Sequence, residues 1–196
     1  MAKLLYQGHG SYRITSNDNV VLYFDPFAGK GYDEPADIIL VTHQHGDHNN
    51  IQIVVKKEDC TIIQNMDAIK NGKYQSFDVK GIHIQAVSAY NKNHKQSESV
   101  GFIITVDGIK IYGSGDTSTT GEMKEFAALA FDYALLPIDG VYNMDPVEAA
   151  VCADLIGAKH SIPVHMKPGE LFDIKMAERF TAKSRLIVKA GETISL

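Results

Sequence analysis

Residues 42–48 read Thr-His-Gln-His-Gly-Asp-His and directly follow the apolar run 38–41, Ile-Ile-Leu-Val. His43 and His45 are two residues apart, so at the end of a strand their side chains point to the same side. The glycine that follows lets the chain turn, which directs the aspartate and the last histidine toward the same point. Imidazole and carboxylate groups suit zinc, manganese or iron, and three or four of them with an open position are typical of a catalytic site. The segment therefore predicts a metal centre at the end of a buried strand.

Length and composition indicate an ordinary globular protein. The chain has 196 residues, 44% of them apolar and 22% charged, so we expect a single domain spanning residues 1–196. The net charge is -5 and only three arginines occur. Because nucleic-acid binding proteins neutralise phosphates with basic side chains, this composition argues against nucleic acid as a partner.

The two cysteines and the N-terminus bear on the compartment. Cys60 and Cys152 are not spaced as paired metal ligands, so we expect free thiols rather than a disulfide. The N-terminus turns polar after two leucines, and no apolar stretch reaches membrane-spanning length. We expect a cytoplasmic protein that acts on a small molecule and binds no membrane; whether it forms a homo-oligomer is left open.

The hydrophobic pattern predicts many strands and few helices. The expected strands are 3–7, 11–15, 20–24, 38–42, 61–64, 82–89, 100–106, 109–112, 133–136, 161–164 and 185–189. The expected helices are 51–58, 122–129, 145–156 and 173–183. Asp107-Gly108 is a hairpin signal, and Asp145-Pro146 is a helix start. A strand-rich start with an alternating finish predicts a mixed sheet system covered by helices.

Three further metal-competent residues follow predicted strands. His94 lies in a polar loop after strand 82–89, Asp116 follows Gly113-Ser114-Gly115, and His165 ends the strand 161–164. Each alone has an ordinary alternative, because a loop histidine is usually exposed to solvent and an aspartate after glycine usually caps a turn. Their shared position at strand ends makes them candidates to complete a site for two metals.

These motifs resemble those of the metallo-β-lactamase superfamily over nearly the whole chain. The likeness is carried by the His-x-His-x-Asp-His block at 43–48, by Gly-Asp-Thr at 115–117 and by the strand histidine at 162–165. The stretches 5–11, 24–27 and 89–94 resemble a small hydrolase branch related to L-ascorbate-6-phosphate lactonase and N-acyl phosphatidylethanolamine phospholipase D.

The resemblance implies a fold of the α+β or mixed α/β class. Its architecture would be a four-layer αββα sandwich with the active site on one rim of the two sheets. It also implies two divalent metal ions, zinc first, with manganese or iron as alternatives. One ion would be held by His43, His45 and His94. The second would be held by Asp47, His48 and His165, with Asp116 bridging both.

Such a centre predicts hydrolysis of an ester, lactone, amide or phosphodiester by a metal-bound hydroxide. Its residual positive charge favours an anionic substrate and stabilises an oxyanion. Asp47 would relay a proton, and His9 in the Gly-His motif would contact the substrate, support a ligand or lie buried as a structural residue. For the leaving-group acid or oxyanion donor, the candidates are Tyr90, Asn91, Tyr142, Asn143 and Lys167.

Two other functions remain open from the sequence. One is a di-iron redox protein of the same fold, against which the absence of a flavodoxin-like segment counts. The other is a metal-binding regulatory protein without catalysis, against which the full ligand set counts. Asp25 either orients a ligating imidazole or caps a turn before Pro26, whereas His83 and His160 fit structural positions.

Overall fold

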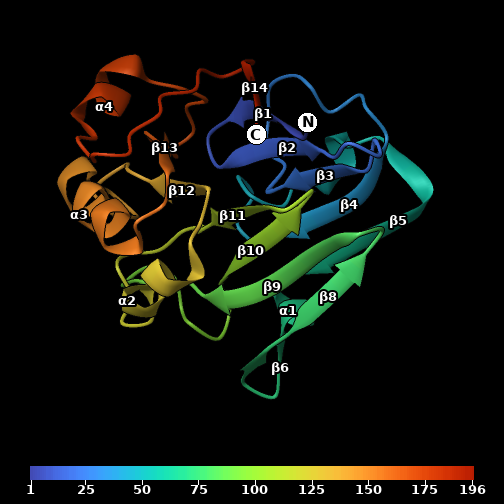
Figure 1. Ribbon diagram of the computed structural model, residues 1–196, viewed down its shortest axis with the longest axis horizontal. Helices are drawn as coiled ribbons and strands as arrows, with labels where there is room; N and C mark the ends of the chain where they lie inside the picture. The colour runs from blue at the N-terminus through green and yellow to red at the C-terminus, as the bar shows by residue number, and fades with distance from the viewer.

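The computed structural model describes all 196 residues and contains two six-stranded sheets packed face to face (Figure 1). In spatial order the first sheet contains β14 (Thr193–Ser195), β1 (Lys3–Gly8), β2 (Ser11–Thr15), β3 (Val21–Phe24), β4 (Ala36–Val41) and β5 (Lys56–Gln64). The second contains β13 (His160–Val164), β12 (Tyr133–Pro137), β11 (Ile109–Gly113), β10 (Val100–Val106), β9 (Ile82–Ser88) and β8 (Ser76–Val79). A small hairpin, β6 (Ile69–Lys70) and β7 (Lys73–Tyr74), projects from the sandwich.

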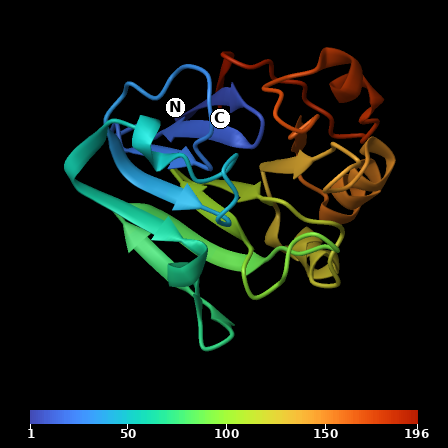
Figure 2. The same ribbon diagram turned by 180° about the vertical axis from the view of Figure 1, so that it is seen from behind.

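The helices are short and lie mainly on the second sheet (Figure 2). They are α1 (Asn65–Ala68), α2 (Met123–Phe126), α3 (Pro146–Ile156) and α4 (Ile174–Arg179), with 3-10 turns at Ile51–Ile53 and Ala127–Leu129. Apolar side chains of α2, α3 and α4 share one buried cluster with the outward residues of β10, β11 and β12. The outer face of the first sheet is covered by Tyr32 and Val54 from connecting segments. No helix has both the length and the apolar character needed to cross a bilayer.

The main core lies between the two sheets and is made by side chains that alternate along the strands. On β9, Ile82 and Ile84 are buried while His83 and Gln85 are exposed, as the period of two requires. Every residue of β4 is buried, because both of its faces are covered. The sequence reasoning is therefore confirmed in its fold class and in most of its strands.

The ends of two predicted elements are also confirmed. Asp107 and Gly108 form the turn of the β10–β11 hairpin, both with positive φ, as the Asp-Gly signal predicts. The Asp145 side chain accepts hydrogen bonds from the backbone N–H groups of Val147 and Glu148, which caps α3 at its start. Gly157 ends the helix in the left-handed region.

Several predicted elements are wrong. Residues 51–58 form a single 3-10 turn followed by the start of β5, because this segment pairs with β4 as an edge strand. Residues 185–189 form no strand and contribute one isolated bridge, between Ser161 and Arg185. The edge of the first sheet is closed instead by β14. Neither β8 nor the β6–β7 hairpin was predicted, and α4 ends earlier than expected.

Strand direction determines where the polar residues gather. β3, β4 and β5 run parallel to one another, as do β11, β12 and β13. Parallel neighbours end at the same edge of a sheet, so the residues that follow β3, β4, β11, β12 and β13 meet at one rim. The backbone joins the two sheets there, because the His165 N–H donates to the His9 carbonyl at 2.8 Å.

Candidate metal centre

All seven ligands expected from the sequence lie together at this rim. His43, His45, Asp47 and His48 follow β4, and three more come from the loops after β9, β11 and β13: His94, Asp116 and His165. Their ligand atoms fall into two groups, within each of which all atoms lie within 4.8 Å of one another. Asp116 lies between the two groups.

The first group consists of His43, His45 and His94. His43 Nε2 lies 3.1 Å from His45 Nδ1, and the rings of His43 and His94 are 4.9 Å apart between centroids. Burial, together with the neighbouring His48, lowers the pKa of His43 to about 2, and burial also lowers the pKa of His94. The imidazoles of His43 and His94 are therefore neutral at neutral pH, which is the form that binds metal.

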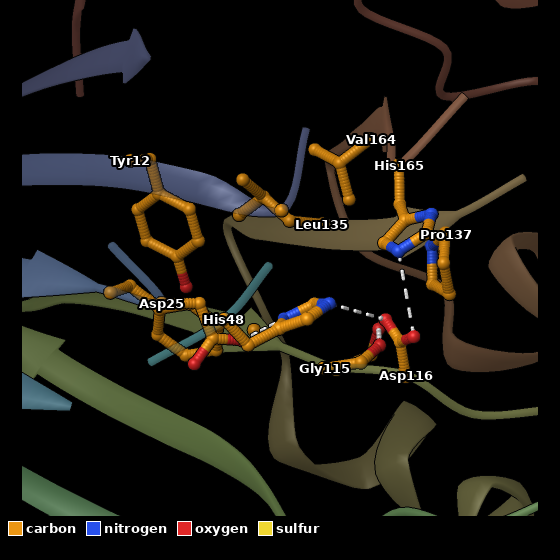
Figure 3. A pocket seen from close by; sticks show the side chains of 13 residues that line it. Tyr12, Asp25, His48, Gly115, Asp116, Leu135, Pro137, Val164 and His165 are labelled. Carbon is orange, nitrogen blue, oxygen red and sulfur yellow. Dashed lines mark hydrogen bonds and ion pairs between the residues drawn. The ribbon is translucent and has the colours of Figure 1, made fainter. Parts of the chain in front are cut away.

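The second group adds His9 to the three residues expected, Asp47, His48 and His165. Figure 3 shows His48 and His165 directed at the same carboxylate, that of Asp116. Asp116 Oδ1 lies 3.4 Å from His48 Nε2, and Oδ2 lies 3.5 Å from His165 Nε2 and 3.3 Å from His94 Nε2. Asp116 thus faces both groups at once.

Unpaired buried atoms test whether these residues fit a metal. His48 and His165 are almost completely buried, and the Nε2 atom of each has no hydrogen-bond partner. Leaving a buried polar atom without a partner lowers the stability of the folded state by about 1–3 kcal/mol. Native proteins therefore rarely contain such an atom unless water, an ion or a ligand binds it. Two such atoms aimed at one carboxylate fit a bound cation.

The charges of the second group agree with that reading. Burial alone would raise the pKa of the Asp116 carboxyl, but the facing imidazoles of His48 and His165 hold it well below its ordinary value. Burial alone would lower the pKa of His165, but Asp116 together with Asp139 and Asp47 raises it to about 10. The carboxylates therefore stay ionised and favour a positive charge at this position.

Asp25 and Thr42 orient two of the ligands. Asp25 Oδ2 lies 2.8 Å from His48 Nδ1, and it also accepts a hydrogen bond from the Thr42 hydroxyl at 2.7 Å. Since that hydroxyl donates to Asp25, it accepts from His43 Nδ1 at 2.9 Å. Both imidazoles thus carry a proton on Nδ1 and turn Nε2 toward the other ligand candidates, His43 toward His45 and His48 toward Asp116. Of the two roles open for Asp25, the structure shows the orienting one.

Asp139 was missed in the sequence. It lies two residues beyond β12, its side chain is completely buried, and its Oδ2 lies 3.1 Å from His165 Nδ1. The signal was present, because Asp139 follows a strand that lies between the strands preceding Asp116 and His165. In the same way Asn91 Oδ1 lies 3.0 Å from His94 Nδ1.

Three buried residues of the site hold unusual backbone conformations. His9, Asp25 and His165 have φ values of 56°, 43° and 46°, in the left-handed region that glycine prefers. Each such residue costs about 1–3 kcal/mol and persists only where the surrounding structure enforces it. Strain of this kind is found most often at functional sites, and here each of the three residues directly follows a strand.

The other residues proposed for catalysis differ in where they lie relative to the site. His9 is fully buried; the Glu170 carbonyl accepts from its Nδ1 at 3.0 Å, and its Nε2 lies 3.1 Å from Asp47 Oδ2. Tyr90 is tied to Thr117 through its backbone N–H and carbonyl. A cavity of about 400 Å³ opens over the two groups, and its only tyrosine is Tyr142; the lining residues are His45, Asp47, Asn93, His94, Asp116, Tyr142 and His165.

The chain is similar to known proteins of one superfamily. Residues 3–165 match the model of the beta-lactamase superfamily domain. A UPF0173 metal-dependent hydrolase of Thermococcus onnurineus is 31% identical, with both chains covered in full. Another, from Pyrococcus furiosus, is 29% identical, again over both full chains.

Solved structures show the same fold. A protein described as a metal-dependent hydrolase, from Parabacteroides distasonis, superimposes with a TM-score of 0.77 at 29% identity, covering 97% of this chain and 94% of its own. Igni18, a metallo hydrolase of Ignicoccus hospitalis, has a TM-score of 0.75 at 23% identity, with 98% and 97% covered. The chain belongs to the beta-lactamase superfamily and is a metal-dependent hydrolase.

Proposed function

We propose that this enzyme uses two divalent ions to hydrolyse an ester, lactone or phosphodiester bond in a small anionic metabolite. The observation that carries the proposal is the position of Asp116: its Oδ2 lies 3.3 Å from His94 of the first group and 3.5 Å from His165 of the second, and its Oδ1 lies 3.4 Å from His48 of the second. A carboxylate that faces imidazole nitrogens of both groups is suited to bridge two cations. His43, His45 and His94 would hold one ion, and Asp47, His48 and His165 the other, with zinc as the first candidate and manganese or iron as alternatives.

When bound, the two ions would lower the pKa of a coordinated water to about 7 and polarise the oxygen of the attacked group. Asp47 is the ligand candidate best placed to move a proton, because it lines the cavity and its side chain keeps 34% of its surface exposed. His9 holds that carboxylate through the 3.1 Å contact between Nε2 and Oδ2. His9 therefore acts by positioning Asp47.

The cavity supports a small polar substrate. Its volume of about 400 Å³ suits a metabolite, and Tyr142 is the one apolar residue among those that line it. Tyr142 is half exposed, so its hydroxyl is the candidate to protonate a leaving group or hold an oxyanion. Lys167 is paired with Asp173, and Tyr90 does not line this cavity, so both are weaker candidates than the sequence suggested.

The test combines elemental analysis with activity. Protein stripped by a chelator and reloaded with zinc or manganese is expected to hold two ions per chain and to regain hydrolysis of at least one member of a lactone, ester and phosphodiester panel. Turnover that persists in fully metal-free protein would remove the proposed nucleophile. A maximum of one ion per chain would remove the binuclear mechanism.

A further inference from the structure

Two loops at the mouth of the cavity are joined by a line of side-chain amides. Asn91 follows β9, and Asn143 lies in the segment between β12 and α3. Asn91 Nδ2 donates to Asn143 Oδ1 at 3.1 Å, and Asn143 Nδ2 donates to Asp139 Oδ2 at 2.8 Å. Each end of this line contacts a candidate metal ligand: Asn91 contacts His94 and Asp139 contacts His165, at 3.0 and 3.1 Å.

The direction of every donor in this line is fixed by its neighbours. Asn91 Oδ1 accepts the backbone N–H groups of Asn93 and His94, at 2.8 and 3.0 Å, so the amide cannot be reversed. The Asp139 carboxylate accepts the backbone N–H groups of Val141 and Tyr142, so Asn143 must turn its NH₂ toward it. His94 Nδ1 then donates to Asn91 Oδ1, His165 Nδ1 lies 3.1 Å from the Asp139 carboxylate, and both rings turn Nε2 toward Asp116.

We infer that Asn91 and Asn143 are positioning residues that couple the two metal sites, by linking His94 of one group and His165 of the other through one continuous chain of polar contacts. The inference rests on the proposed function, in which these two histidines hold different ions. It changes the role suggested by the sequence, where both asparagines were candidates to contact the substrate. Their amide groups are instead engaged with each other and with the ligands' partners.

If the two sites are coupled, one substitution should weaken the binding of both metal ions, whereas a residue that supports a single ligand should affect one ion only. Partners of ligating histidines commonly account for about 10- to 100-fold in metal affinity. Asn143→Ala removes the bond to Asp139 and the bond to Asn91 together, so both ions should bind about 10-fold more weakly or worse. Asn91 and Asn143 share one bond, so the double variant should lose less affinity than the sum of the two single losses.

The experiment titrates cobalt(II) into metal-free protein against a competing chelator and reads both stepwise affinities from the visible spectrum. Asn93→Ala is the matched control, because Asn93 Nδ2 donates to the same Tyr142 carbonyl as Asn91 does but contacts no ligand. Its metal affinities should stay within about twofold of the parent protein. Thermal unfolding confirms that each variant is folded, and Asn143→Ser, too short to reach either partner, replaces Asn143→Ala if that variant fails to fold.

Hydrogen exchange at the histidine ring protons distinguishes a specific loss of ligand positioning from a general destabilisation of the fold. In zinc-loaded, ¹⁵N-labelled protein, the Nδ1 protons of His94 and His165 should exchange faster in Asn143→Ala, while that of His48, held by Asp25, should not change. Parent protein that binds fewer than two ions contradicts the proposed function. Parent protein that binds two ions, with Asn143→Ala unchanged or weakened at one ion only, contradicts the coupling.

Discussion

Asp25 Oδ2 and His48 Nδ1 lie 2.8 Å apart, and neither side chain retains more than 1% of its surface in contact with solvent. Both come from the first sheet, one after β3 and the other after β4. Because Thr42 also donates to Asp25 and accepts from His43, this single carboxylate orients one ligand of each group. The first sheet and the second sheet thus each supply their own buried support for the metal centre.

Asp25→Asn should weaken metal binding by about 10- to 100-fold, because an amide keeps the shape of the side chain but not the charge that fixes the His48 tautomer. Competition with a chelating dye measures the loss. Asp33→Asn, at an exposed position on the following loop, is the control and should bind metal as the parent does. Equal affinity of the two variants would show that His48 needs no carboxylate.

Asp116→Asn should reduce the bound metal from two ions toward one, because it removes the negative charge that faces both ligand groups. Elemental analysis after dialysis gives the stoichiometry. Asp107→Asn changes an exposed carboxylate in the β10–β11 turn, so its metal content and activity should stay nearly unchanged. If the two variants hold the same amount of metal, Asp116 is not a bridging ligand.

Gly113→Ala should destabilise the fold by about 1–3 kcal/mol or more, because overpacking a filled core forces neighbouring groups apart. A Cβ at this position would lie 2.2 Å from the Tyr12 hydroxyl and 2.6 Å from the Phe24 ring. Gly121→Ala, where nothing lies within 4 Å, should change stability by less than about 0.5 kcal/mol. Urea unfolding of metal-free protein compares them, and equal midpoints would contradict the close contact between the sheets.

Asp37 supplies a pH-dependent part of the stability. Burial would raise the pKa of its carboxyl, but Lys57 and Lys80, each 2.6 Å away, lower it below the ordinary 3.8. A lowered pKa stabilises the folded state above pH 3.8, and this contribution is lost as the pH falls toward the lowered value. Asp37→Asn should lower the free energy of unfolding by about 1–3 kcal/mol at pH 7, toward the lower end because the two lysines are partly exposed. The loss should be smaller at pH 3.

Unfolding of the parent and Asp37→Asn at both pH values measures that difference. Asp59→Asn is its control, because Asp59 contacts the same Lys80 but its side chain keeps 70% of its surface exposed. It should leave the free energy of unfolding nearly unchanged at either pH, because solvent screens an exposed ion pair. A gap between parent and Asp37→Asn that is as large at pH 3 as at pH 7 would mean that charge is not the cause.

The metal centre could be predicted from the sequence where its residues are neighbours in the chain. Four ligand candidates lie within 43–48, and alternation along a strand already places His43 and His45 on one side. Asp25 was one candidate partner that the sequence offered, and the position of Asp139 after a neighbouring strand was a signal. Their actual contacts could not be predicted, because Asp139 reaches His165 and Asn143 reaches Asn91 only between separate loops. No periodicity encodes such contacts.

The fold was predictable wherever burial imposes a pattern. β4 is buried throughout and β9 alternates, whereas the first half of β5 carries charged residues on an exposed edge, so a helix was predicted there and a strand only for residues 61–64. Pairing with β4 determines the conformation of β5. β14 has three residues and is specified by its partner β1 rather than by its own composition.

The left-handed backbone conformation of His9, Asp25 and His165 lowers the stability of the folded state at the rim that carries the chemistry. Glycine would occupy each position without strain but can neither ligate nor orient a metal. The strain is offset by what these buried side chains hold: the hydrogen bonds of Asp25 to Thr42 and His48, and the contact of His9 with the Glu170 carbonyl. The three side chains and the bent backbone beneath them are therefore expected to be kept or lost together.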